Sequence, residues 1–192
     1  YTLSYTLSLH DALPISNSNE ASSSRATSQP EPSLQLTSIF RRPCIETIRP
    51  GTGKSSVISL LVQSLAREEH IDRQHAEKII SELLTRERHG SSAIGRGLAF
   101  PHLRTVDVDH FVGAIGIAPQ GINFESVDGE PTRLVLLTLS PWEGREAHSS
   151  LLSRLVSLMK DKVVTLQLRH SQSPDDLYDY LTDLDGNNQP RD

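Results

Sequence analysis

Apolar residues recur every three or four positions in four segments of the chain, which is the spacing of one buried face of an α-helix. The first segment follows Lys54, and the second begins with a capping signal at Asp72 and stops at Gly90. The third runs over about Arg145–Lys160, and the fourth follows the start signal at residues 173–176. The residues expected to face inward in these four helices are Val57, Leu60, Leu61 and Leu65; Ala76, Ile79, Ile80, Leu83 and Leu84; Leu151, Leu152, Leu155 and Met159; and Leu177, Leu181 and Leu184.

Two further segments, Phe111–Ile117 and Leu134–Leu139, are apolar at nearly every position and are bounded by turn residues. A strand that is apolar on both faces belongs in the centre of a sheet with helices on each side. The predicted fold class is therefore α/β, a single three-layer α/β/α domain with a central mixed β-sheet. In Val163–Leu168, alternation and β-branched residues favour a strand, whereas the helical neighbours leave little room for one.

The composition divides the chain into a domain and two flanking segments. We assign residues 34–186 to the domain and residues 187–192 to a C-terminal tail. Residues 1–33 form a non-native or low-complexity segment, because residues 6–16 resemble the translation of a sequencing adapter and residues 16–33 contain seven serines with almost nothing apolar. We expect this N-terminal extension to be disordered. Because the only methionine is Met159, we also expect the natural N-terminus to lie outside this sequence.

Charge and composition argue against several classes of function. The formal net charge of −5 has the wrong sign for a protein that gains affinity by neutralising nucleic-acid phosphates. No apolar run approaches the roughly 18 residues that a membrane span needs. Cys44 is the only cysteine, which excludes an internal disulfide and a thiolate metal cluster. We therefore expect a cytoplasmic protein that neither binds nucleic acid nor inserts into a membrane.

The segment Gly51-Thr-Gly-Lys-Ser55 ends like a phosphate-binding P-loop. The motif requires a glycine five positions before Gly53, where this chain has Ile48, and the sequence indicates no buried strand leading into the segment. We interpret it as a turn that enters a helix. A P-loop nucleotide hydrolase stays open as an alternative that rests on this segment alone.

A second group of residues, between Arg86 and Arg104, contains four arginines and one glutamate, a local charge of +3. Its three glycines at positions 90, 95 and 97 allow the backbone to approach a ligand closely, and Ser91 and Ser92 offer hydroxyl donors. Pro101 stiffens the chain before His102. The pattern predicts an anion site, and its alternative is a solvated glycine-rich loop.

These residues resemble the phosphohistidine signature of the type-2 enzyme IIA domains, the fructose, mannitol and nitrogen-related components of the bacterial sugar phosphotransferase system. The signature consists of the helix end Arg86-Glu87, then Ile94-Gly95 and Leu98-Ala99-x-Pro101-His102. The resemblance continues through Gly121-Ile122-x-Phe124, Asp128-Gly129 and Ala147-His148-x-x-Leu151-Leu152. Two residues depart from it: Phe100 replaces a smaller aliphatic residue, and Leu103 replaces Gly, Ala or Cys, which would narrow the access of a partner to His102.

The resemblance implies a phosphocarrier without metal or cofactor. His102 would accept a phosphoryl group, Arg86 would clamp its oxygens, and His148 at a helix start would donate a hydrogen bond to them. Ser91 or Ser92 would lie at the rim of a shallow, accessible site. The donor would be an HPr-type phosphocarrier protein, and the acceptor an enzyme IIB domain or a regulatory target. For Val163–Leu168 the resemblance implies a helix or turn.

Two further interpretations stay open. The domain could be a non-catalytic regulatory module that phosphorylation switches, or the IIA subunit of a fructose or mannitol transporter. No enzyme IIB-like or membrane-spanning segment follows the domain in this sequence, which favours a stand-alone carrier of the nitrogen-related type. We expect the remaining histidines of the domain to be surface residues: His70, His75, His89, His110 and His170.

Overall fold

The two continuous apolar runs form the central strands of a six-stranded mixed sheet. The computed structural model describes residues 35–187. In it β5 (Val112–Ile122) and β6 (Thr132–Pro141) lie antiparallel, side by side, and most of their residues are buried on both faces. The predicted mixed sheet is confirmed. The predicted disordered segment, residues 1–33, lies outside the described residues, as does the chain from residue 188 onward.

Shorter strands flank this central pair in the order β1-β5-β6-β3-β2. β1 (Phe40–Thr47) runs parallel to β5, and β2 (Ala93–Gly95) runs antiparallel to β3 (Leu98–Ala99). β3 and β4 (His102–Thr105) pair in parallel with successive parts of β6. This arrangement places the Pro101-His102 segment along the outer side of β6.

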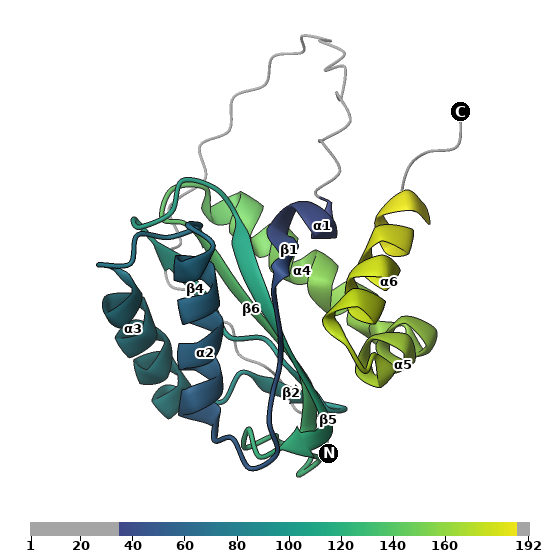
Figure 1. Cartoon of the computed structure of the whole chain (residues 1–192). Coiled ribbons are helices and arrows are strands. Elements are labelled where there is room, and N and C mark those ends of the chain that lie inside the picture. Colours follow the sequence, from purple (N-terminus) through teal and green to yellow (C-terminus); the bar gives the residue numbers. More distant parts are fainter. Residues whose placement is uncertain (1–34, 188–192) are drawn as a thin grey trace, which may run out of the picture. The chain divides into compact units, whose positions relative to one another are not determined.

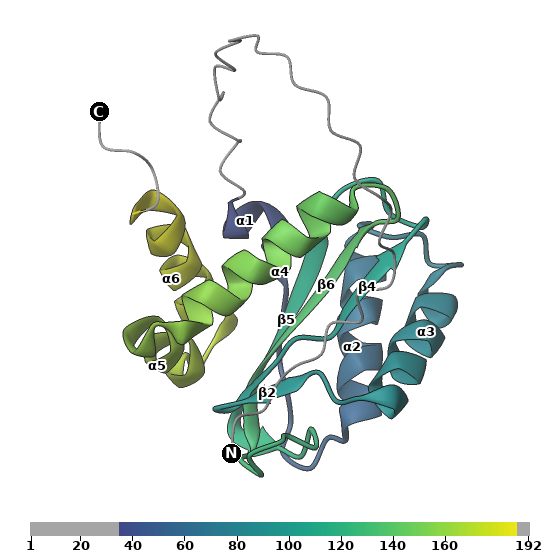
Figure 2. The ribbon, with the colours of Figure 1, turned by 180° about the vertical axis from the view of Figure 1, so that it is seen from behind.

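Helices cover both faces of the sheet and create two separate hydrophobic cores. One core packs α2 (Lys54–Arg67) and α3 (Ala76–His89) against the sheet. The other core contains residues of α1, α4, α5 and α6 (Leu36–Ile39, Arg145–Lys160, Lys162–His170 and Pro174–Asn187). Figure 1 shows α2 and α3 on one face, and Figure 2, seen from behind, shows α4 crossing the other. The predicted three-layer α/β/α fold is therefore confirmed.

The four predicted helices all form, but the start of α3 differs from the prediction. Asp72 does not cap the helix. Its carboxylate accepts a hydrogen bond from the Gln74 backbone N–H in the preceding turn, and His75 is the residue before the first helical position. Gly90 follows α3 as predicted, in an extended conformation.

The ambiguous segment Val163–Leu168 is helical, as the family resemblance implies. It lies within α5, whose start is capped by the Asp161 carboxylate, which accepts hydrogen bonds from the N–H groups of Val163 and Val164. Thr165 and Leu168 face the core, which is helical spacing. Capping and packing therefore outweigh the local alternation.

The strand β1 was not predicted, and the expectation that no strand precedes the Gly51–Ser55 segment is wrong. Residues 41–43, Arg-Arg-Pro, interrupt the apolar pattern of β1 and hide it from periodicity. Its Phe40 ring occupies the space above Gly113, where any added Cβ would lie 2.5 Å from the ring. The turn interpretation of the segment is confirmed, since α2 begins at Lys54 directly after Gly53.

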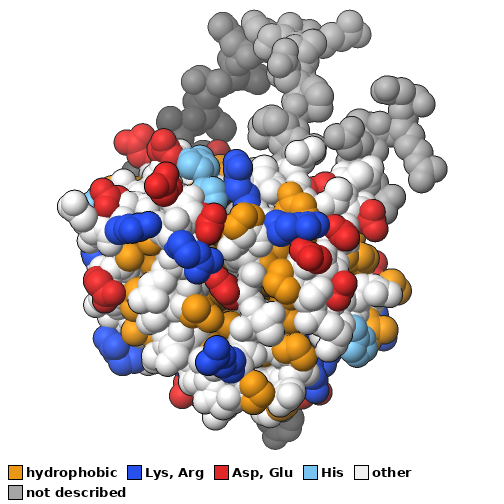
Figure 3. Space-filling view, in the orientation of Figure 1, with side chains coloured by type: hydrophobic (Ala, Val, Ile, Leu, Met, Phe, Trp, Pro, Cys, Tyr) orange, Lys and Arg blue, Asp and Glu red, His pale blue; other side chains and the backbone are white. Residues whose placement is uncertain are grey.

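The surface over α2, α3 and β1 mixes both signs of charge. Acidic and basic side chains are interspersed on this face, with apolar side chains between them (Figure 3). Within residues 35–187, none of the helices has the length and apolar content needed to cross a membrane.

Candidate functional site

His102 begins β4, the short strand that lies along the outer side of β6. Its Nδ1 lies 2.9 Å from the carbonyl oxygen of Phe100. A carbonyl oxygen only accepts hydrogen bonds, so Nδ1 carries the hydrogen and Nε2 keeps a free electron pair. Burial lowers the pKa of His102, with a smaller contribution in the same direction from the charge of Arg86. The ring is therefore a neutral nucleophile at neutral pH.

His148 lies beside His102, in the first turn of α4. The two ring centroids are 5.7 Å apart and the ring planes are inclined by 44°. The Nδ1 of His148 lies 2.6 Å from the hydroxyl oxygen of Ser140, at the end of β6. Burial lowers the pKa of His148, and His102, Arg104 and Arg86 lower it further. The structure thus brings together two neutral imidazoles that are 46 residues apart in the sequence.

Arg86 approaches the same site from the last turn of α3. Together with His102, Ser91 and Ser92, it lines a cavity of about 400 Å³. The Arg86 side chain is exposed, and its positive charge acts on both histidines. The residues predicted from the sequence for the anion site therefore gather at one place, with His148 on the α4 side of His102.

The two serines of the site have different hydrogen-bond states. The Ser91 hydroxyl donates to the backbone oxygen of Phe124 (2.8 Å) and accepts from the N–H of Ala93. The Ser92 hydroxyl is buried and has no hydrogen-bond partner among the described residues. A buried polar atom without a partner is costly, and of the two serines only Ser92 has such a hydroxyl among the described residues.

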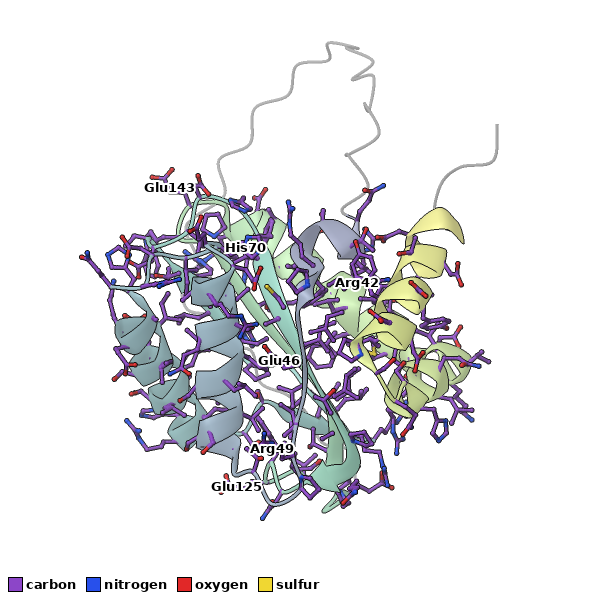
Figure 4. All side chains as sticks on the ribbon, viewed as in Figure 1. Arg42, Glu46, Arg49, His70, Glu125 and Glu143 are labelled. Atoms are coloured by element: carbon purple, nitrogen blue, oxygen red, sulfur yellow. The ribbon has the colours of Figure 1, made fainter. Side chains whose placement is uncertain are left out.

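Sequence reasoning missed a carboxylate that borders this cavity. The Glu87 side chain is 6% exposed, and its two oxygens accept from the N–H of Ser92 at 3.1 and 3.2 Å. The Lys54 ammonium lies 3.5 Å from Glu87 and 2.5 Å from Glu125, which is beside the start of α2 (Figure 4). Lys54 therefore neutralises carboxylates here. The only signal in the sequence was the position of Glu87 directly after Arg86.

A second cavity, of about 420 Å³, adjoins the first through Arg86. Arg104 and Trp142 form one wall: the guanidinium stacks on the indole ring at 4.9 Å and donates to the backbone oxygen of Trp142. Leu103 also lines this cavity but is 5% exposed and packs in the core beneath α2 and α3. The expectation that Leu103 narrows the access of a partner to His102 stays a prediction, since Leu103 packs in the core and also lines the cavity next to the site.

The other predicted properties of the site concern residues elsewhere in the fold. Phe100 is buried in the core on the α4 side. Among the remaining histidines, three are exposed: His89, His110 and His170. His70 and His75 are partly exposed, and the side chain of His75 is 46% exposed. None of the five is buried, as predicted. In the part of the chain that the structure describes, no three His, Cys, Asp or Glu side chains are grouped so as to hold a metal ion.

Comparison with known proteins gives a family match. The family model described as Phosphoenolpyruvate-dependent sugar phosphotransferase system, EIIA 2, matches residues 38–184. The nitrogen regulatory protein of Escherichia coli (strain K12) is 29% identical over 154 residues, which cover 80% of this chain and 93% of that protein.

Solved structures share the fold. The nitrogen regulatory protein IIA-Ntr from Neisseria meningitidis has a TM-score of 0.67 at 24% identity, over 76% of this chain and 98% of that chain. A complex of enzyme IIAMTL and phosphorylated enzyme IIBMTL from Escherichia coli gives a TM-score of 0.61 at 20% identity, over 76% of this chain and 99% of the matched chain.

Proposed function

Since this chain belongs to the EIIA 2 family of the phosphoenolpyruvate-dependent sugar phosphotransferase system, we propose that it carries a phosphoryl group on Nε2 of His102. The observation that carries the proposal is the hydrogen bond from His102 Nδ1–H to the Phe100 carbonyl oxygen. This bond holds the ring and leaves Nε2 as the free nucleophilic atom. Arg86 lines the same cavity as His102, and the His148 ring lies 5.7 Å from the His102 ring, each held by a different helix.

The reaction is a transfer between two imidazoles. The electron pair of His102 Nε2 attacks the phosphorus of a phosphohistidine on the donor protein. A new N–P bond forms, the donor N–P bond breaks, and its electron pair returns to the donor ring. Because the transferred group passes through a loose, metaphosphate-like state, positioning and charge neutralisation supply most of the catalysis.

The groups around His102 suit this task. The guanidinium of Arg86 can hold two phosphoryl oxygens in its planar fork. The Ser92 hydroxyl, buried and without a partner among the described residues, can donate to a third. Ser91 supports the loop through its bond to Phe124. Lys54 offsets the negative charge of Glu87, which would otherwise repel the phosphoryl group.

The partners follow from the chemistry of an exposed carrier site. An HPr-type phosphocarrier is the proposed donor, and an enzyme IIB domain or a regulatory target is the proposed acceptor. The IIAMTL protein of Escherichia coli, which shares this fold, forms a complex with phosphorylated IIBMTL, and this supports a IIB-type acceptor. The relative named nitrogen regulatory protein, matched over 93% of its length, favours the nitrogen-related type.

The experiment is a phosphorylation assay with phosphoenolpyruvate, enzyme I and HPr, read as intact mass. The expected product contains one acid-labile, base-stable phosphate. His102→Ala should abolish it, and His110→Ala, which removes an exposed histidine elsewhere, should leave it unchanged. Undiminished phosphate in His102→Ala would overturn the proposal. Binding of HPr or a IIB domain without phosphate incorporation would instead show that the chain is a binding protein and not a carrier.

A further inference from the structure

Ser140 is a buried hydroxyl residue behind the site that the transfer chemistry above does not use. It lies near the end of β6, opposite Arg104 in the parallel register with β4, and is 1% exposed. After Ser140 the chain turns through residues 141–144 into α4 and returns with His148. The connection brings the Ser140 hydroxyl oxygen to 2.6 Å from His148 Nδ1.

Two atoms that can accept a hydrogen bond lie near the Ser140 hydroxyl, which has one proton to donate. The backbone oxygen of Leu103 lies 3.5 Å from the Ser140 oxygen, beyond the usual range of about 2.5–3.0 Å for a hydroxyl donor. His148 Nδ1 is much nearer. When the hydroxyl proton points to this nearer atom, His148 Nδ1 is the unprotonated ring nitrogen and the ring hydrogen lies on Nε2.

We propose that Ser140 is a positioning residue that fixes His148 as the Nε2–H tautomer, so that His148 donates a hydrogen bond to the phosphoryl group on His102. The proposal rests on the proposed function for its purpose. A neutral imidazole that presented an electron pair at Nε2 would repel the phosphoryl oxygens, whereas an N–H group attracts them.

The two histidines are thus held in opposite tautomers by opposite kinds of partner. A carbonyl acceptor, that of Phe100, keeps the hydrogen of His102 on Nδ1 and leaves Nε2 free to attack. A hydroxyl donor, that of Ser140, keeps the hydrogen of His148 on Nε2. Arg86 and Arg104 oppose protonation of His148, so the tautomer of the neutral ring decides what it offers to an anion.

The test is the ring-nitrogen NMR spectrum of the ¹⁵N-labelled full chain at about pH 8, more than a unit above the ordinary pKa of histidine. Long-range ¹H–¹⁵N correlations distinguish the two tautomers, and His148→Gln assigns the signals of His148. We expect the Nε2–H form in the unmodified protein and a mixture of both forms in Ser140→Ala. An Nδ1–H form in the unmodified protein, or an unchanged spectrum in Ser140→Ala, would overturn the proposal.

A transfer assay gives the second readout. Loss of one hydrogen bond between neutral groups lowers a rate constant by about 2- to 10-fold when the bond is made in the transition state. Ser140→Ala should therefore slow phosphorylation of His102 by that factor. Ser140→Thr keeps the hydroxyl and should restore the rate and the tautomer together. Ser64→Ala, which removes a buried hydroxyl from α2, is the control and should change neither. Because the NMR measurement uses unphosphorylated protein, failure of the tautomer assignment and failure of the phosphocarrier function give different results.

Discussion

Lys54 faces two carboxylates, and we predict that the more distant one matters more for stability. Its ammonium lies 2.5 Å from Glu125, whose side chain is 70% exposed, and 3.5 Å from Glu87, whose side chain is 6% exposed. Exposed ion pairs are screened by water and contribute roughly 0–1 kcal/mol. For a buried pair at 3.5 Å, the Coulomb attraction at an effective dielectric constant of 20 is about 5 kcal/mol before desolvation is subtracted.

The perturbation is Lys54→Met, which leaves the Glu87 carboxylate buried without its counter-ion. Breaking a buried pair from one side costs roughly 3–5 kcal/mol, and the partial exposure of Lys54 places the expected loss near the lower limit, about 3 kcal/mol. The assay is urea unfolding at pH 7 with linear extrapolation to water. The matched control is Glu125→Gln, for which we expect a loss below about 1 kcal/mol.

A second substitution tests the cause of the loss. In the double variant Lys54→Met with Glu87→Gln, the amide is neutral and its oxygen can still accept from the Ser92 N–H. It should therefore be more stable than Lys54→Met alone. The reasoning is refuted if Glu125→Gln costs as much as Lys54→Met, or if the double variant is no more stable than the single one.

Three other predictions follow from the site and its scaffold. Arg86→Ala should lower the rate of phosphorylation by about 10²–10³ in stopped-flow or quench assays, the usual loss for one transition-state contact; a rate within a factor of three of the unmodified protein would remove Arg86 from the site. Because burial lowers the pKa of His102, the rate of phosphorylation should rise with pH with a midpoint below the ordinary histidine value of about 6.5; a pH–rate profile still rising between pH 7 and 8 would contradict this. The same shift means that protonation of His102 opposes folding, so its contribution to stability is lost as pH falls below about 6.5. Asp185→Ala should destabilise the domain by about 2 kcal/mol in thermal or urea unfolding, because this buried carboxylate accepts three hydrogen bonds of 2.8 Å from Leu36 and Thr37 of α1. Asp183→Ala, at an exposed position of the same helix, should change stability by less than about 0.5 kcal/mol. Equal losses in the two variants would show that the hydrogen bonds of Asp185 to α1 contribute nothing.

The elements that periodicity predicted are those whose environment is uniform along their length. The helices over Lys54–Arg67 and Arg145–Lys160 each bury one stripe, and β5 and β6 are buried on both faces. In these elements the apolar residues are the buried ones, so the order of apolar and polar residues reveals the element. β1 was missed because three successive exposed residues, 41–43, separate its buried residues Phe40, Cys44 and Ile45, so its burial follows no strand period. The strands β2, β3 and β4 are too short, at two to four residues, to show any period.

The sequence alone determined the family, the two-sided sheet and the segment that carries His102, the proposed acceptor. These depend on local spacing, and the signature from Arg86 to His102 lies within a single stretch of chain. It also indicated His148, but only through the family resemblance, because nothing local separates a histidine on an apolar stripe from an ordinary core residue.

Only the tertiary structure decided how these groups are arranged and what holds them. The contact of Lys54 with Glu87 spans 33 positions, and the 5.7 Å approach of His102 and His148 arises where β4 pairs with β6 and α4 begins. It also decided that Leu103 packs in the core, and that the Ser92 hydroxyl has no hydrogen-bond partner among the described residues while the Ser91 hydroxyl donates to Phe124. Hydrogen-bond direction and burial depend on atoms that other segments bring within 3 or 4 Å, and polarity along one chain does not encode those neighbours.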